Sequence, residues 1–126
     1  MAKVIHDDVL DGALNIVKNN ATRQVVCSAE PTTYTEANST FALADVTMAS
    51  GDFTNANGDT SGRKTTVAAK SSVLIDGSGT ATHVALLDVA NTKVLAVTTC
   101  TSQGLTANGS NTVNFPAWDI ELSDPT

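Results

Sequence analysis

Two histidines, His6 and His83, are the only imidazole bases in the sequence. A serine or cysteine nucleophile needs such a base within hydrogen-bond reach, and a third group to orient the base. His6 falls in a predicted N-terminal arm. His83 begins a predicted strand, where a hydrogen-bonded histidine has a structural role. Because no nucleophile, base and orienting group stand together, we predict no catalytic residues and no enzymatic activity.

Carboxylates are more numerous, and two that converge in a fold can serve as the acid and base of a glycosidase. Their spacing singles out no pair. The candidates are Asp7, Asp8, Asp11, Glu30, Glu36, Asp45, Asp52, Asp59, Asp76, Asp88, Asp119 and Glu121.

Two short motifs are relevant to ligand binding. The run Gly77-Ser78-Gly79 lacks the third glycine of a dinucleotide fingerprint, and a predicted strand follows it instead of a helix N-terminus. The loop containing Asp52, Asn55, Asn57 and Asp59 offers oxygen ligands, but not in the order of a calcium-binding loop. We therefore predict no cofactor and no metal.

The two cysteines, Cys27 and Cys100, lie far apart in the sequence. There is no Cys-x-x-Cys pair and no histidine at metal-ligand spacing. We interpret them as two buried free thiols, with a single disulfide as the alternative.

The composition limits the partners. The 126 residues correspond to one domain with a formal net charge of −6 and a pI near 4.5, so binding to nucleic acid is disfavoured. No apolar run approaches the roughly 18 residues of a membrane span, and acidic residues precede any run of signal-peptide length. We expect no membrane association, and a product kept in a cytoplasm or released by lysis.

A helix is predicted within Val4–Asn19, where apolar residues recur at intervals of three and four. Asp7 is predicted to cap its start, and Asn19-Asn20 to end it. Gly12 costs about 1 kcal/mol relative to alanine, so the helix must pack against the domain. Its apolar face is predicted to comprise Val9, Leu10, Ala13, Leu14 and Val17.

After Ala21 the chain reads as short extended runs separated by turn residues. We predict a mainly β fold, an antiparallel β-sandwich or barrel of about seven short strands with one N-terminal amphipathic helix, as a single domain over 1–126. Ser50–Gly62 is predicted as a polar loop or wide hairpin, and Gly104–Asn111 as a second loop. The predicted strands are Arg23–Ser28, Phe41–Met48, Lys64–Ala68, Ser71–Ile75, His83–Asp88, Lys93–Thr98 and Val113–Leu122, with Pro116 indicating an edge position or a bulge in the last.

The runs Val84–Leu87 and Val94–Val97 are continuously apolar, which indicates strands covered on both faces. Because one small helix cannot provide all of that cover, we expect a neighbouring subunit to provide part of it, as in a homo-oligomer. The alternative is that small alanine side chains tolerate partial exposure.

The N-terminal residues 1–8 are predicted to form a docking arm. Val4-Ile5 precedes the predicted cap and can add a short strand to the exposed edge of a neighbour. The competing interpretation is a hydrophobic staple, in which Val4 or Ile5 folds back onto Leu10 or Ala13. Near the other terminus, Phe115 and Trp118 flank Pro116, either as core residues or as an exposed interface anchor.

Three blocks of sequence resemble a family of short tailed-phage virion proteins. They are VIHDDVLD (4–11), ATRQVVCSAEPTTYTEA (21–37) and GTATHVALLD (79–88), and together they reach across about two thirds of the chain. The last block is the least specific of the three. The resemblance implies a structural component located in the virion and assembled in the host cytoplasm, with no catalytic residue to carry over.

Within that class, the first hypothesis is a capsid decoration protein that binds major capsid subunits. The alternative partners are neck or tail proteins, for a tail, collar or head-fibre component. A surface carbohydrate-binding module is the hypothesis from a different class, since β-sandwiches often hold sugars against exposed aromatic residues. Five aromatic residues give that module few platforms.

Overall fold

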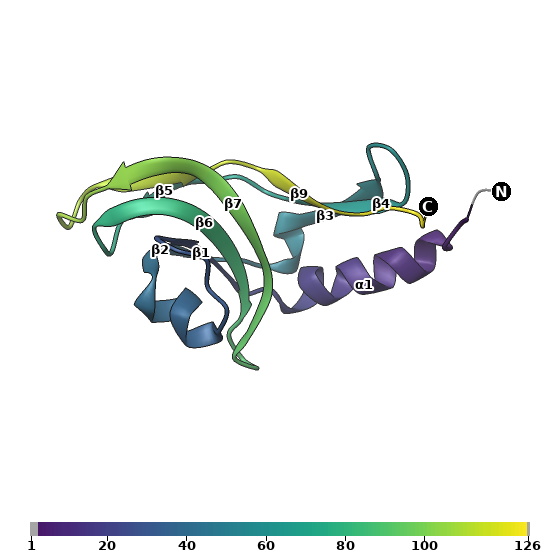
Figure 1. The fold of residues 1–126 in the computed structure, drawn as a ribbon, viewed down its shortest axis with the longest axis horizontal. Helices are drawn as coiled ribbons and strands as arrows, with labels where there is room; N and C mark the ends of the chain where they lie inside the picture. The colour runs from purple at the N-terminus through teal and green to yellow at the C-terminus, as the bar shows by residue number, and fades with distance from the viewer. Residues whose placement is uncertain (1–2, 126) are drawn as a thin grey trace.

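The computed structural model describes residues 3–125, which form one N-terminal α-helix and nine strands in antiparallel sheets (Figure 1). The predicted mainly β fold with an N-terminal helix is thus confirmed. The elements are α1 (Asp7–Asn20), β1 (Arg23–Cys27), the π-helix η1 (Glu36–Thr40), β2 (Ala42–Thr47), the 3-10 turn η2 (Ser50–Asp52), β3 (Phe53–Asn57), β4 (Arg63–Val67), β5 (Lys70–Leu74), β6 (Gly79–Asp88), β7 (Lys93–Leu105), β8 (Thr112–Phe115) and β9 (Trp118–Leu122).

The described strands exceed the predicted number for two local reasons. The predicted last strand divides after Phe115 into β8 and β9, which join different sheets. Pro116, at this division, has no N–H to donate to a ladder. Of the two predictions for Ser50–Gly62, a polar loop or a wide hairpin, the hairpin is confirmed, because the segment contains β3, which pairs with β4. Gly62 ends that hairpin turn at φ +71°, where a Cβ would lie 2.0 Å from the carbonyl oxygen of Leu122.

The largest sheet has four strands in the order β2-β1-β6-β7. β1 lies between β2 and β6, and the β6–β7 hairpin turns at Val89–Thr92, between the predicted strands His83–Asp88 and Lys93–Thr98. β7 continues to Leu105, well past the predicted end at Thr98. Its pairing with β6 is irregular around Cys100–Ser102, where three residues of β7 face the single residue Thr82.

Both faces of this sheet are covered by the chain itself. On one face, Cys27, Ala85 and Leu87 pack with Ala37 of η1, whose segment lies beneath the sheet in Figure 1. On the other face, Leu86 packs in a cluster with residues of β3 and β4. Ala85, Leu86 and Leu87 have no exposed surface. The expectation that a neighbouring subunit covers part of this run is therefore wrong for these three residues. In β7, Val94–Val97 is half-buried.

The two-stranded sheet β5-β8 joins the four-stranded sheet along β2. Ala44 forms a β-bridge with Ile75, and the N–H groups of Asp76 and Gly77 both donate to the carbonyl of Leu43, at 2.7 and 2.9 Å. The turn that contains Gly77-Ser78-Gly79, which was compared with a phosphate-binding loop, thus covers the edge of β2. Val73 and Ile75 complete an apolar cluster with Val26 of β1 and Phe115 of β8.

The three-stranded sheet β3-β4-β9 extends away from the four-stranded sheet, and α1 runs along it (Figure 1). Leu10 and Leu14 are the buried residues of the helix. The helix starts at Asp7, but the predicted cap is wrong by one residue, because the Nδ1 atom of His6 accepts the hydrogen bond from the N–H of Asp8. The helix ends at Asn20, as predicted.

Candidate docking surface

The histidines lie in settings that do not assemble a catalytic group. His6 is largely exposed, and its Nδ1 atom contacts the N–H of Asp8 at 3.1 Å. The Nδ1 atom of His83 lies 2.8 Å from the hydroxyl of Thr82 on the same strand. Within residues 3–125, no three His, Cys, Asp or Glu side chains gather as a metal site would require.

The four oxygen-bearing residues that were compared with a calcium-binding loop do not converge on one point. Asp52 lies in η2, Asn55 and Asn57 lie in β3, and Asp59 lies in the turn that follows. Each forms a hydrogen bond or an ion pair with a different residue, at 2.7–2.9 Å. Their partners are Lys70, Asn15, Arg63 and Lys64, respectively. The contacts of Asn57 and Asp59 lie within the β3–β4 hairpin, that of Asn55 joins the hairpin to α1, and that of Asp52 joins η2 to β5.

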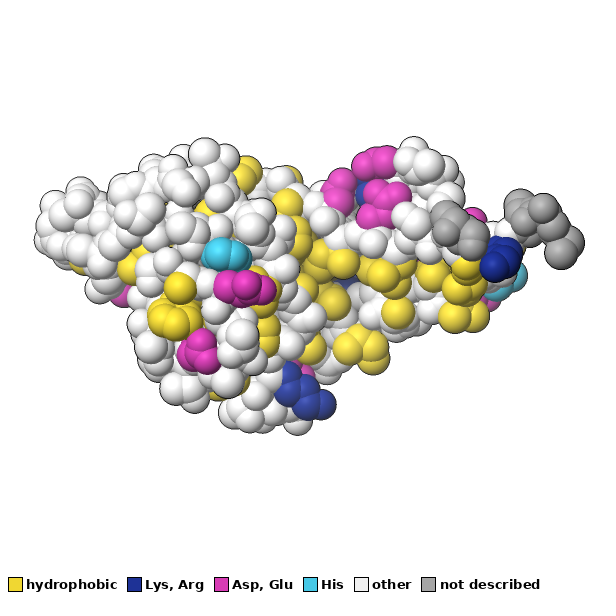
Figure 2. Space-filling model, in the orientation of Figure 1, with side chains coloured by type: hydrophobic (Ala, Val, Ile, Leu, Met, Phe, Trp, Pro, Cys, Tyr) yellow, Lys and Arg dark blue, Asp and Glu magenta, His cyan; other side chains and the backbone are white. Residues whose placement is uncertain are grey.

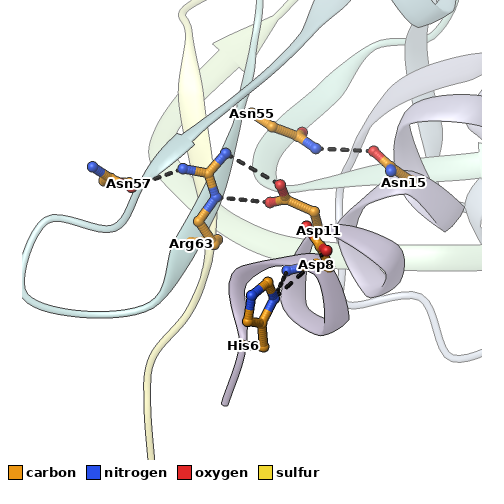
Figure 3. Close-up of polar contacts among 7 residues, drawn as sticks. All are labelled: His6, Asp8, Asp11, Asn15, Asn55, Asn57 and Arg63. Atoms are coloured by element: carbon orange, nitrogen blue, oxygen red, sulfur yellow. Dashed lines mark hydrogen bonds and ion pairs between the residues drawn. The ribbon is translucent and has the colours of Figure 1, made fainter. Parts of the chain in front are cut away.

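A polar clamp fixes α1 to that hairpin (Figure 3). The guanidinium of Arg63 donates two hydrogen bonds to the carboxylate of Asp11, from Nε to Oδ1 at 2.8 Å and from Nη2 to Oδ2 at 3.2 Å. Its third donor, Nη1, reaches the side chain of Asn57 at 2.7 Å. One helical turn further, Asn15 accepts from Asn55 at 2.9 Å. The bidentate geometry sets the rotation of α1 about its own axis.

The apolar side of α1 is wider than the body of the protein covers. Leu10 and Leu14 face inward, but Val9 is 63% exposed, Ile16 is 56% exposed, and Ala13 between them is also exposed. These three residues, which we call the outer stripe, share one side of the helix at the i, i+4, i+7 spacing. The prediction that Val9 and Ala13 belong to the buried face is wrong, because the neighbouring sheet contacts only the side of Leu10 and Leu14.

The outer stripe is accessible along its length. Figure 2 shows apolar side chains gathered along α1, in the half of the molecule toward the N-terminus. At Gly12, beside the stripe, an added Cβ would meet nothing within 4 Å. Because the clamp prevents α1 from rolling inward, Val9 and Ile16 stay in water unless another molecule covers them.

A cleft forms the second open surface, between β7 and the β8–β9 segment. It consists of two adjoining cavities of about 150 and 320 Å³ that run along Thr98–Gln103 on one side and Asn114–Asp119 on the other. β7 and β8 are both end strands of their sheets. Among the described residues, no main-chain hydrogen bond joins β7 to β8 or β9.

The cleft has an apolar floor and a polar end. Val26, Ala81, Val84 and Phe115 line the smaller cavity, and Cys100 lines both. In the larger cavity, the indole Nε1 of Trp118 donates to Oε1 of the fully buried Gln24 at 2.8 Å. This bond holds β9 against the four-stranded sheet. Trp118 is half-buried and hydrogen-bonded, so it is not the exposed interface anchor that was one of its two interpretations.

The two thiols are free, as the adopted interpretation predicts. Cys27 is fully buried in the cluster beside η1, whereas Cys100 is half-buried on the side of Phe115. Burial, reinforced by the nearby Cys100, raises the pKa of Cys27 to about 11. Burial also raises the pKa of Cys100.

Aromatic side chains offer no open platform in the described chain. Phe53 and Phe115 are buried, and Tyr34, Phe41 and Trp118 are half-buried against the clusters. Among residues 3–125, none of the helices combines the length and the apolar character needed to cross a bilayer.

Comparison with known proteins returns no relative. No protein-family model, no curated protein and no solved structure matches the chain. Its function is therefore inferred from its own residues.

Proposed function

We propose that this chain is a non-catalytic structural subunit of a tailed-phage particle, and that it acts as a capsid decoration protein that binds major capsid subunits. The observation that carries the docking role is the outer stripe of Val9, Ala13 and Ile16 on a helix that the Asp11–Arg63 clamp holds in place. The resemblance of residues 4–11, 21–37 and 79–88 to short virion proteins supports the assignment to a phage particle.

The size of the stripe indicates the kind of docking. Burying a Val or Ile side chain completely stabilises by about 1.5–3 kcal/mol, so the exposed parts of Val9 and Ile16 offer about 2–4 kcal/mol together. Bringing two free proteins together costs about 4–15 kcal/mol in lost freedom of motion. The stripe alone therefore does not hold two free molecules. It suits a subunit that contacts a large assembly at several points at once.

The test is the copy number of this chain in purified particles, relative to the major capsid protein. Hundreds of copies are expected for a decoration protein. A dozen or fewer would overturn decoration in favour of the neck or tail, and absence from the particle would overturn the structural role.

A double variant and a control variant of α1 test the outer stripe itself. Val9→Lys combined with Ile16→Lys places two charges on it, and we expect the affinity for particles to fall at least about tenfold, because a loss of 1.4 kcal/mol is already tenfold in Kd. Asn19→Lys adds a charge to an exposed polar position of α1 that is not part of the outer stripe, and this variant should bind normally. Equal occupancy of the two variants, with melting temperatures like wild type, would rule out the stripe as the contact.

A further inference from the structure

The residues before α1 form a short extended segment that we call the arm, Lys3–His6. They have no regular secondary structure, and the backbone of His6, at φ −57° and ψ 141°, is extended. Val4 is 76% exposed, the most exposed large apolar side chain among the described residues. His6 caps α1, and among residues 3–5 one hydrogen bond reaches the rest of the domain, from the N–H of Ile5 to Oδ1 of Asp124 at 3.5 Å. Residues 1 and 2 of the predicted arm lie outside the described residues, and its predicted end at residue 8 is wrong, because Asp7 and Asp8 belong to α1.

The cleft between β7 and the β8–β9 segment has what such an arm needs. The free edges of β7 and β8 present backbone N–H and C=O groups to which another extended backbone can hydrogen-bond, which is the requirement for strand addition. The smaller cavity, about 150 Å³ with an apolar floor, has room for an aliphatic side chain. The irregular pairing of β7 at Cys100–Ser102 interrupts the sheet beside this cavity.

Charge favours the same occupant. Among the described residues that line the cleft, Asp119 alone is charged. It shares the ammonium group of Lys64 with Asp59, so these three side chains together carry one net negative charge. The arm carries Lys3 next to Val4. Successive side chains of a strand point to opposite sides, so a strand that directs Val4 into the apolar floor directs Lys3 toward the rim. An acidic segment at this position would instead meet Asp119 with like charge.

An arm cannot enter the cleft of its own molecule. Four extended residues span at most about 14 Å. In Figure 1 the start of α1 lies at one end of the long axis, whereas β5 and the neighbouring part of β7 lie toward the other end. Any arm in the cleft therefore comes from another molecule.

We infer that the cleft between β7 and the β8–β9 segment receives the arm of a second copy of this chain, with Val4 in the apolar cavity beside Cys100. Because arm and cleft lie at opposite ends, the contact is head-to-tail, and repeating it produces a ring or a filament. This inference concerns a surface separate from the outer stripe and does not depend on the proposed function.

A cysteine at position 4 tests the contact directly. Val4→Cys places a thiol where it would meet Cys100 of the next copy, while Cys27 stays buried. Under mild oxidation at high protein concentration, we expect disulfide-linked dimers and longer ladders on a non-reducing gel. The same substitution in a Cys100→Ser background should lose the ladder. Val9→Cys, exposed on the outer stripe, is the matched control and should not crosslink to Cys100.

Two results would overturn the inference. One is a ladder that persists without Cys100, and the other is crosslinking of Val9→Cys to Cys100 as strong as that of Val4→Cys. Alkylation of Cys100 in the unmodified chain is a second measurement. Its rate should fall at least about tenfold as protein concentration rises, and Val4→Asp should abolish the fall, because a charge in the apolar cavity opposes insertion. A rate independent of concentration in the unmodified chain would exclude a second copy as the occupant.

Discussion

The two edge strands of the four-stranded sheet, β2 and β7, differ in how far the rest of the chain covers them. At the β2 edge, Ala44 bridges to Ile75, and two N–H groups from the following turn donate to the carbonyl of Leu43. At the β7 edge, thirteen residues from Lys93 to Leu105 pair with β6 alone among the described strands, and a cleft separates them from β8.

Local sequence accounts for the difference. After β5, Asp76 and Gly77 turn back onto β2, and Gly79 packs so closely that a Cβ there would lie 3.1 Å from Cδ2 of Leu43. Opposite β7 stands Pro116, which cannot donate a main-chain hydrogen bond and separates β8 from β9. The chain thus closes one side of a barrel-like arrangement and leaves the other side available for docking.

The largest expected effect comes from the closed edge. Leu43→Ala removes a buried side chain from the cluster with Val73 and Ile75, and should lower the free energy of unfolding by about 2–5 kcal/mol. Thr101→Ala, on an exposed residue of the open edge, should change it by less than about 0.5 kcal/mol. Urea denaturation measures both. Similar losses would show that the two edges are equally closed.

The reactivity of the two cysteines also tests the difference between the buried interior and the open β7 edge. Raising the pKa of Cys27 from 9.0 to about 11 lowers its thiolate fraction at neutral pH by about 100-fold, and the side chain is fully buried. Cys100 lines the cleft. At low protein concentration, mass spectrometry should find iodoacetamide on Cys100 long before Cys27. Comparable rates, or faster labelling of Cys27, would contradict the description of the cleft as the open side.

The hydrophobic sequence pattern was enough to predict the helix and the strands of the large sheet, because their buried parts, such as Val84–Leu87 of β6, are continuously apolar. It could not divide the apolar side of α1 into buried and exposed parts. That division depends on the clamp between Asp11 and Arg63, which are 52 residues apart.

The cleft was not predictable in the same way. Its walls come from β7 and from the segment around Pro116, and their separation depends on how the sheets close. The long run after Val94, which contains neither proline nor a charged residue as far as Leu105, was the available signal for an unprotected edge. The π-helix η1, which covers β6, gave no periodic signal because it is one short turn.

A smaller effect on stability is expected at the hydrogen bond between Trp118 and Gln24, which holds β9 beside the cleft. Trp118→Phe removes the donor to Gln24 and leaves a buried acceptor without a partner, so it should lower the free energy of unfolding by about 1–3 kcal/mol. Adding Gln24→Met to Trp118→Phe should recover most of that loss, because neither polar group then remains. A double variant as unstable as the sum of the single variants would show that the bond is not the cause.

The smallest expected effect is on the stability of the folded protein at low pH. Hydrogen bonds from Thr66, and then from Lys64, lower the pKa of Asp119 below its usual 3.8. A lowered pKa stabilises the folded state above pH 3.8, and that contribution is lost as the pH falls through the lower, folded value. Asp119→Asn and Thr66→Val should each make the fall in stability between about pH 4 and pH 2 shallower. A steeper fall in either variant would reverse the assignment.

The most direct test compares amide hydrogen exchange in the free chain with exchange in the chain bound to particles. We expect new protection in α1 around the outer stripe and in β7 at Thr98–Gln103, because other subunits cover both surfaces there. β2, already closed by β5, should exchange alike in both states. Unchanged exchange in both α1 and β7, in a chain shown to be particle-bound, would contradict the account that these two surfaces are the sites of docking.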